Sequence, residues 1–164
     1  ASCRQKIKDA LKIVMTKTED ELISFIDNFR KDFNQLPPEE ISFPRTVSDV
    51  NKYKSSSTLY SKGTPIHARG AILYNHLIKE KKLDKKYAKI QNGEKIKFCY
   101  LINPNPFRNN TIAFINILPR EFNINKYIDY DMQFEKSFIE PLKIILDCIN
   151  WKTKKISTLE DLFG

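Results

Sequence analysis

The chain has 164 residues, of which 41% are hydrophobic, and a formal net charge of +8. This length suits about one domain, the apolar fraction is sufficient for a packed core, and the charge favours a polyanionic partner such as nucleic acid or an acidic membrane surface. No stretch provides the roughly twenty apolar residues of a membrane span, and no secretory signal is visible. Cys3, Cys99 and Cys148 have no paired spacing, so neither a disulfide framework nor a zinc knuckle is supported.

The excess positive charge is confined to the middle of the chain. Lys and Arg outnumber Asp and Glu by 13 to 4 in residues 45–97, whereas the counts are 7 to 8 before this stretch and 8 to 8 after it. Such a distribution is typical of one cationic binding surface, and also of a solvated lysine surface. Charge alone leaves both interpretations open.

Two amphipathic helices are predicted at the start of the chain. Ser2 with Gln5 has the capping-box spacing, and apolar residues then recur at helical intervals through residue 17. Thr18 with Glu21 repeats the capping signal and is followed by a second helix ending before LPPEE. Its apolar stripe consists of Leu22, Phe25, Ile26, Phe29 and Phe33.

The next stretch changes character at its prolines. LPPEEISFPR is predicted as an extended connector that carries Ile41 and Phe43 into the core, and a polar, basic loop follows up to Gly63. Thr64 and Pro65 then predict an N-cap followed by proline at the first helical position, beginning a third helix that reaches the KEKK run.

The last third combines strands and helix. After the Asn92–Gly93 turn, the alternating EKIKFCYLI and the later TIAFINIL predict an antiparallel strand pair. A helical pattern from Phe134 to Ile149 follows, within which Pro141 marks either a kink or the start of a new helix. The predicted class is therefore α+β, mainly helical, with a small antiparallel β hairpin or sheet.

Catalytic patterns are few. The four glycines have no phosphate-loop spacing, and His67 and His76 lack Cys or carboxylate partners at metal-ligand spacing. Asp129 and Asp131 suggest a Mg²⁺ pair only if they lie on a strand. At the opening of a helix they point about 200° apart, so we interpret them as carboxylates that favour a helix N-terminus.

The start of the third helix is the strongest binding candidate. Helix N-termini expose unpaired N–H groups, which makes this one a predicted phosphate site. Side chains before and within it can also contact a sugar-phosphate backbone without reading sequence. The predicted contacts are Ser48, Asn51, Lys52, Tyr53, Lys62, Thr64, His67 and Arg69. A capped helix after a soluble loop is the alternative and stays open.

The C-terminal STLEDLFG suggests a short docking peptide. Ser157 and Glu160 have the capping-box spacing, so one helical turn would bring Leu159, Leu162 and Phe163 together. Three apolar anchors on one turn are typical of a ligand for a groove on another protein. The alternative is that this segment folds back onto its own domain.

Four stretches carry a resemblance to a known family. TPIHARGAILYNHLI (64–78), GEKIKFCYLINPNPF (93–107), IDYDMQFEKSFIEPL (128–142) and STLEDLF (157–163) together resemble the thumb domain of the family B replicative DNA polymerases of T-even-like bacteriophages. The likeness spans essentially the whole chain. It implies that the contacts predicted above, with Lys136 added, grip the backbone and minor-groove side of primer-template duplex, and that Leu159, Leu162 and Phe163 dock on the sliding clamp.

The resemblance also bounds the function. It implies a thumb domain over residues 1–151 and a flexible clamp-binding tail over 152–164, in the cytoplasm of an infected bacterial host. The catalytic aspartates of this nucleotidyltransferase family and their Mg²⁺ belong to a palm domain not present here, so the chain alone is expected to be inactive and without a cofactor. It is expected to be an excised fragment or a separately encoded last part of the polymerase, with palm, fingers and exonuclease domains as partners and no membrane.

Two other functions stay open from the residues. One is a free-standing RNA-binding module, which the basic composition also suits. The other is a small metal-independent nuclease that uses His67 and His76 as acid and base.

Overall fold

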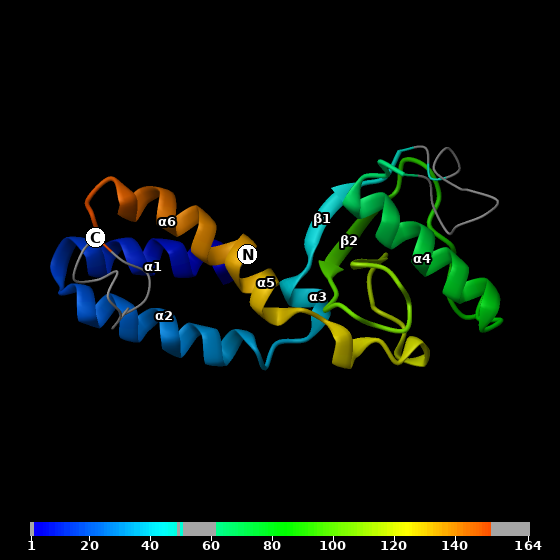
Figure 1. Ribbon diagram of the computed structural model, residues 1–164, viewed down its shortest axis with the longest axis horizontal. Helices are drawn as coiled ribbons and strands as arrows, with labels where there is room; N and C mark the ends of the chain where they lie inside the picture. The colour runs from blue at the N-terminus through cyan, green and yellow to red at the C-terminus, as the bar shows by residue number, and fades with distance from the viewer. Residues whose placement is uncertain (1, 49, 51–61, 152–164) are drawn as a thin grey trace. The chain divides into compact units, whose positions relative to one another are not determined.

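The computed structural model describes residues 2–48, 50 and 62–151. These residues fall into two compact units, one containing the chain up to Leu36 and again from Phe134 onward, the other containing Pro37–Gln133. The second unit is thus inserted into the first. Figure 1 shows the elements of both.

The first unit begins with two helices, α1 (Ser2–Thr16) and α2 (Glu19–Phe33), which run side by side (Figure 1). The predicted N-cap of α2 is confirmed, because the Thr18 hydroxyl accepts a hydrogen bond from the Glu21 N–H at 3.3 Å. Ser2 already belongs to α1, and its side chain lies outside the described part of the chain.

The π-helical turn η4 (Glu135–Ile139) and helix α6 (Glu140–Asp147) complete this unit. They continue helix α5 (Tyr130–Phe134), of which only Phe134 belongs to the first unit. The Glu140 N–H donates to the carbonyl five residues back, at Glu135. Pro141 has no N–H, and its ring excludes a carbonyl four residues earlier, so a widened turn before it relieves that conflict. Of the two outcomes predicted for Pro141, the structure shows the start of a new helical segment.

Four phenylalanines form the centre of the first unit. The Phe29 ring lies 4.9 Å from Phe138, 5.5 Å from Phe134 and 6.0 Å from Phe33, measured between centroids and packed edge to face. The Arg30 guanidinium covers the Phe134 ring at 4.4 Å, a favourable cation–π position. Phe29 and Phe33 are four residues apart on α2, and Phe134 and Phe138 are four residues apart across the end of α5 and the π-helical turn, so each pair projects from one side of its segment.

At the start of the second unit, the structure differs from the predicted extended connector. LPPEEISFPR is not wholly extended: it forms a one-turn helix α3 (Pro38–Ile41) and then strand β1 (Phe43–Thr46). Proline at the first helical position costs nothing, because that N–H has no helical partner anyway. The Ser42 N–H and hydroxyl both donate to the Pro38 carbonyl and close the turn. Ile41 is buried, as predicted, whereas Phe43, also predicted in the core, is only partly buried.

β1 joins β2 (Lys95–Tyr100) and β3 (Thr111–Phe114) in an antiparallel sheet of order β1-β2-β3. The predicted β2–β3 pair is confirmed, and β1 adds a third strand. Pro44 is tolerated because β1 lies at the edge of this sheet. Phe43 pairs with Phe98, which on its other side pairs with Ala113.

Helix α4 (Ile66–Glu80) packs on the sheet, mainly on β3 (Figure 1). A Cβ on Gly70 would lie 2.8 Å from the Ala113 nitrogen and 3.2 Å from the Ala113 Cβ, so glycine permits this close approach. Directly opposed residues share a face of a sheet. α4 therefore covers the face that carries Ala113, Phe98 and Phe43.

Two 3₁₀ turns, η2 (Arg120–Phe122) and η3 (Asn125–Tyr127), lead from β3 towards α5. Gln133 closes the unit with a fully buried amide. Its Nε2 donates to the Ile41 carbonyl at 2.8 Å, and its Oε1 accepts from the Tyr100 N–H at 2.9 Å. One side chain thus joins α3 to the end of β2.

The α+β class predicted from the sequence is confirmed, with helices dominant and one small antiparallel sheet. None of the helices in the described ranges is long and apolar enough to cross a membrane. The predicted tail, residues 152–164, lies outside the described residues, and its separation from residues 1–151 stays a prediction.

Candidate nucleic-acid interface

The start of α4 differs by one residue from the prediction. Pro65, not Thr64, occupies the N-cap position, and no side chain caps the helix. The first helical hydrogen bond runs from the Arg69 N–H to the Pro65 carbonyl. The ψ angle of Pro65, 148°, is not helical. Thr64 lies just outside the helix with only 2% of its surface exposed. The prediction that Thr64 caps α4 is wrong, because Pro65 occupies the N-cap position.

This end of α4 is fastened to β3 by polar contacts. The Thr111 hydroxyl donates to the Ile66 carbonyl at 2.8 Å, and the Asn109 amide donates to the Arg69 carbonyl at 3.0 Å. The Arg69 Nε donates to the Thr64 carbonyl at 2.9 Å, which holds the turn before the helix. The unpaired N–H groups of the first helical turn are therefore held in a fixed place.

The structure brings some of the predicted contact residues together. Lys62 is exposed, two residues before buried Thr64, and the partly exposed His67 and Arg69 lie in the first turn of α4. Ser48 is exposed beyond β1. The other predicted contacts of this region, Asn51, Lys52 and Tyr53, lie outside the described residues.

Sequence reasoning missed three neighbours of this helix end. Arg45 is exposed on β1 and close enough to His67 to affect its pKa. Phe43 and Tyr100 are partly exposed on the same sheet face, with ring centroids 6.5 Å apart, and both pack on Phe98. The alternation in FPRT could have indicated a strand, but its pairing with β2 could not be read from local sequence.

His67 has an electrostatic environment that favours its neutral form. Burial and, secondly, the positive charge of Arg45 lower the pKa of His67 below its ordinary value of 6.5. Its ring lies 6.4 Å from the Phe98 ring, centroid to centroid. Near neutral pH, His67 can therefore donate or accept hydrogen bonds without adding a full charge.

The two histidines are badly placed to act as an acid–base pair. His67 and His76 are nine residues apart on one helix, which separates them by about 13 Å along the axis and by about half a turn around it. The His76 Nε2 contacts the Glu80 carboxylate at 2.9 Å, a local pairing on the helix surface. This geometry argues against the nuclease alternative.

Asp129 acts as the sequence interpretation expects. One carboxylate oxygen accepts a hydrogen bond from the Met132 N–H at 3.0 Å, at the start of α5, and Asp131 lies in the first turn of that helix. No group of His, Cys, Asp and Glu that could hold a metal ion occurs among the described residues.

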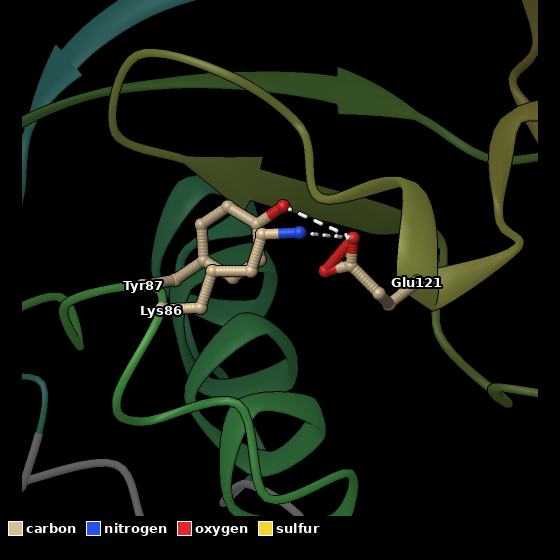
Figure 2. A network of polar contacts seen from close by, with 3 residues as sticks. All are labelled: Lys86, Tyr87 and Glu121. Atoms are coloured by element: carbon tan, nitrogen blue, oxygen red, sulfur yellow. Dashed lines mark hydrogen bonds and ion pairs between the residues drawn. The ribbon is translucent and has the colours of Figure 1, made fainter.

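The C-terminal end of α4 is followed by a loop, residues 81–94, that is hydrogen-bonded to the rest of the unit. Figure 2 shows its main fastening, in which Lys86 Nζ and the Tyr87 hydroxyl reach the same Glu121 oxygen, at 3.2 and 3.1 Å. Desolvation would raise the pKa of the Glu121 carboxyl, but hydrogen bonds from Tyr87 and Lys86 outweigh it and lower that pKa. These hydrogen bonds join the loop to η2.

Lys136 belongs to the first compact unit, on the π-helical turn η4. It is exposed and lies 3.9 Å from a Glu140 oxygen. The predicted clamp contacts Leu159, Leu162 and Phe163 lie outside the described residues.

Comparison with known proteins identifies two similar chains. The chain is 26% identical over 165 aligned positions to the DNA-directed DNA polymerase of Enterobacteria phage T4, and 27% identical to that of Escherichia phage RB69. Each alignment covers 98% of this chain but only 18% of the polymerase, so the chain spans less than a fifth of the length of these relatives. No family model matches the chain. Over nearly its whole length, the chain is thus similar to one segment of T-even phage DNA polymerases, which confirms the resemblance predicted from its motifs.

Proposed function

We propose that residues 1–151 are the thumb of a phage family B DNA polymerase, which holds primer-template duplex without reading its sequence. Residues 152–164 would tether the polymerase to its sliding clamp. Nucleotidyl transfer and the Mg²⁺ that serves it belong, in this proposal, to a palm domain outside this chain. The chain by itself then retains product duplex and does not extend it.

The observation that carries the proposal is the similarity to two phage DNA polymerases over 98% of the chain. Identity of 26–27% over so long a stretch is shared by the whole domain and does not depend on one motif. The placement of the excess positive charge, 13 basic against 4 acidic residues in 45–97, supports the same function. A thumb that holds any sequence needs phosphate contacts, which carry no base information.

The start of α4 supplies the proposed phosphate site. The free N–H groups of its first turn and the partial positive charge of the helix end attract a phosphate oxygen. Lys62 and Arg45 add full charges, both being exposed. Neutral His67 adds a hydrogen-bonding group, because its lowered pKa keeps it uncharged at neutral pH.

Thr64 has an indirect role in this arrangement. Its side chain is buried, so it offers no surface to duplex, but its carbonyl accepts the Arg69 Nε hydrogen bond. We therefore propose that Thr64 positions the turn before α4, while Lys62, Arg45 and His67 face the phosphates. Phe43 and Tyr100, half-buried on the same sheet face, offer apolar edges for the sugars of the minor groove.

The salt dependence of duplex binding tests the proposal. If about four to six phosphates are neutralised, the logarithm of the association constant should fall with the logarithm of salt concentration at a slope of roughly −4 to −5. Fluorescence anisotropy with labelled primer-template duplexes of unrelated sequence measures this slope. Affinity that does not depend on salt, or that depends strongly on sequence, would contradict the proposal.

A matched pair of variants locates the contact. Arg45→Gln with Lys62→Gln should reduce the slope by about 2, because two phosphate contacts are lost. The control, Lys12→Gln with Lys31→Gln, removes two exposed lysines from the first unit and is expected to leave the slope unchanged.

The tether is tested separately. Deleting residues 157–164 should abolish capture of the chain by the phage sliding clamp and leave duplex binding intact. Two weak contacts on one assembly multiply through effective concentration, so the deletion should also shorten the residence of the full polymerase on clamp-loaded DNA. Clamp capture that persists after the deletion would remove residues 157–164 from this role.

The anisotropy assay also distinguishes a thumb domain from an RNA-binding module. An RNA-binding module would prefer structured RNA to primer-template DNA of equal length and would ignore the clamp. The measured ratio of the two affinities decides between these functions.

A further inference from the structure

The segment that follows α4 concentrates positive charge outside the site described above. Residues 79–89, KEKKLDKKYAK, contain six lysines and two carboxylates, and all eight side chains are exposed. We refer to these residues as the lysine connector. The phosphate site at the start of α4 does not include it.

The lysine connector begins with a helix end that glycine would suit better. The Leu83 N–H donates to the Ile78 carbonyl at 2.9 Å and the Lys82 N–H to the Lys79 carbonyl at 3.2 Å, the two hydrogen bonds of a Schellman motif. Lys82 therefore has a left-handed φ of 55°. A lysine thus stands where the local backbone favours glycine, and the helix end alone does not explain it.

The lysine connector then returns along α4. The Tyr74 hydroxyl donates to the Ala88 carbonyl at 2.8 Å, and the Asn75 amide both donates to and accepts from the backbone of Ile90, at 2.9 and 2.8 Å. Lys89 is consequently held beside the middle of the helix. The backbone that carries the lysines is thus fixed at the end of α4 and again beside its middle.

The end of the segment, at Ala88 and Lys89, lies on the side of α4 that carries His67. Tyr74 follows His67 by seven residues, which is close to two full helical turns, so both project from the same side. The segment that contacts Tyr74 therefore continues the flank on which the phosphate site begins.

Most of these charges are not neutralised locally. Of the six lysines, Lys86 alone forms an ion pair within the described ranges, with Glu121 at 3.2 Å. One of the two acidic residues, Glu80, contacts His76. Favourable interaction with the helix dipole fades beyond the last turn, so it accounts for Lys79 and not for Lys85 or Lys89.

The distance between the phosphate site and the far end of α4 favours an extended polyanion as the ligand. The 15 residues of α4 span about 22 Å, which exceeds the Debye length of about 8 Å at physiological salt. A single phosphate or nucleotide cannot reach both ends. The span corresponds to about six steps of 3.4 Å along one strand of duplex DNA.

We propose that the lysine connector is a second phosphate-contact surface for the duplex held at the start of α4, with its nearer end, at Lys89, about four base pairs away and its farther end about six. This inference rests on the proposed function and adds to it a defined footprint. The contacts are made by flexible point charges, so they follow the backbone without reading bases.

The test uses a connector variant that carries Lys81→Gln, Lys85→Gln and Lys89→Gln. These lysines are exposed and form no ion pair among the described residues, so the fold should be retained, and thermal unfolding checks this. On a duplex of about 20 base pairs, the variant should lose about tenfold or more in affinity and its salt slope should shrink by up to about 3. Lys12→Gln, Lys17→Gln and Lys31→Gln form the matched control of equal charge change.

Duplex length provides the second measurement. In a stem-loop with only about five base pairs, one duplex reaches Lys89 but not the lysines at the far end of α4, so the difference between wild type and the connector variant should shrink. It should reappear above about seven base pairs. A difference that does not depend on stem length would overturn the inference.

The outcomes distinguish the inference from the proposed function. If the Arg45→Gln, Lys62→Gln variant weakens duplex binding and the connector variant does not, the thumb proposal stands and the inference fails. If the connector variant binds duplex as wild type does but binds polyglutamate more weakly, the lysine connector is a surface for an acidic protein. That result would also overturn the inference. If wild type shows no salt-dependent duplex binding, both fail.

Lys82→Gly sharpens the test at one residue. Glycine suits the left-handed conformation, so thermal stability should be equal or higher, while duplex affinity should fall because a charge is lost. A variant that is more stable and binds less tightly supports a contact role for Lys82. Unchanged affinity would exclude Lys82 from the contact surface.

Discussion

The two compact units differ in the contacts that stabilise each of them internally. In the first, Phe29 and Phe33 of α2 meet Phe134 and Phe138 in a packed aromatic centre. In the second, buried side-chain amides and hydroxyls join backbone groups that are far apart in sequence, as Gln133 does between Ile41 and Tyr100. Apolar packing fixes the first unit, whereas the second unit adds directional hydrogen bonds to an apolar core of its own.

This difference bears on function. The proposed phosphate site needs free N–H groups in a defined place, and non-directional apolar packing alone would not fix them so closely. Thr111 and Asn109 supply that definition by bonding to the first turn of α4. The following substitutions break one unit or the other, from the largest expected effect to the smallest.

Phe138→Ala should damage the first unit most. The ring is fully buried and lies against Phe29 and Phe134, so its removal leaves a cavity and should lower the free energy of unfolding by about 3–5 kcal/mol. Urea unfolding gives the change, and hydrogen exchange shows where protection is lost. Phe138→Leu, which keeps most of the volume, is the control. Equal loss of protection in the sheet would argue against independently packed units.

Gln133→Leu tests the polar fastening of the second unit. The leucine would leave the Tyr100 N–H and the Ile41 carbonyl buried without this partner, at a cost of about 2–4 kcal/mol in total. Gln133→Glu is the informative companion, since it keeps an acceptor for Tyr100 but loses the donor to Ile41. A leucine variant as stable as wild type would show that apolar packing is sufficient here.

Gly70→Ala places two effects in opposition. Alanine improves helix propensity by about 1 kcal/mol, but its Cβ would meet the Ala113 backbone nitrogen at 2.8 Å. Overpacking against backbone costs about 1–3 kcal/mol, so we expect a net loss of up to about 2 kcal/mol and weaker duplex binding as α4 shifts. Increased stability in calorimetry would mean that the α4–β3 contact can widen freely.

Thr18→Ala should have a smaller effect, confined to the first unit. It removes the hydroxyl that accepts the Glu21 N–H at the start of α2, and N-cap losses of this kind cost about 1 kcal/mol. Thr18→Ser retains the acceptor and should be nearly neutral. Both variants are expected to bind duplex as wild type does, which anisotropy would check.

The smallest expected effect is on pH dependence. Because the pKa of His67 is lowered from 6.5 in the folded chain, the unfolded chain binds more protons just below that pH. Stability should therefore fall as pH decreases through about 6.5, and His67→Gln should weaken that fall. His76→Gln, on the exposed side of α4, is the matched control. An identical pH profile for wild type and His67→Gln would show that His67 titrates normally.

Local sequence was sufficient for much of the fold. The capping pair Thr18 and Glu21, the apolar stripe of α2 and the alternation in β2 each act over a few residues, and each prediction is confirmed. The errors occurred at prolines. Pro38 begins a helical turn and Pro65 takes the cap position, because a missing N–H costs nothing at a helix start and local pattern does not say where that start falls.

The sequence by itself determined the charge excess in residues 45–97, the helical periods and the resemblance to a polymerase thumb. Only the tertiary structure decided that Thr64 is buried, that Arg45 lies close to His67, and that Lys89 returns beside Tyr74. The physical reason is range. Periodicity and capping depend on neighbours three or four residues away, whereas burial and strand pairing depend on contacts across tens of residues, which local pattern does not encode.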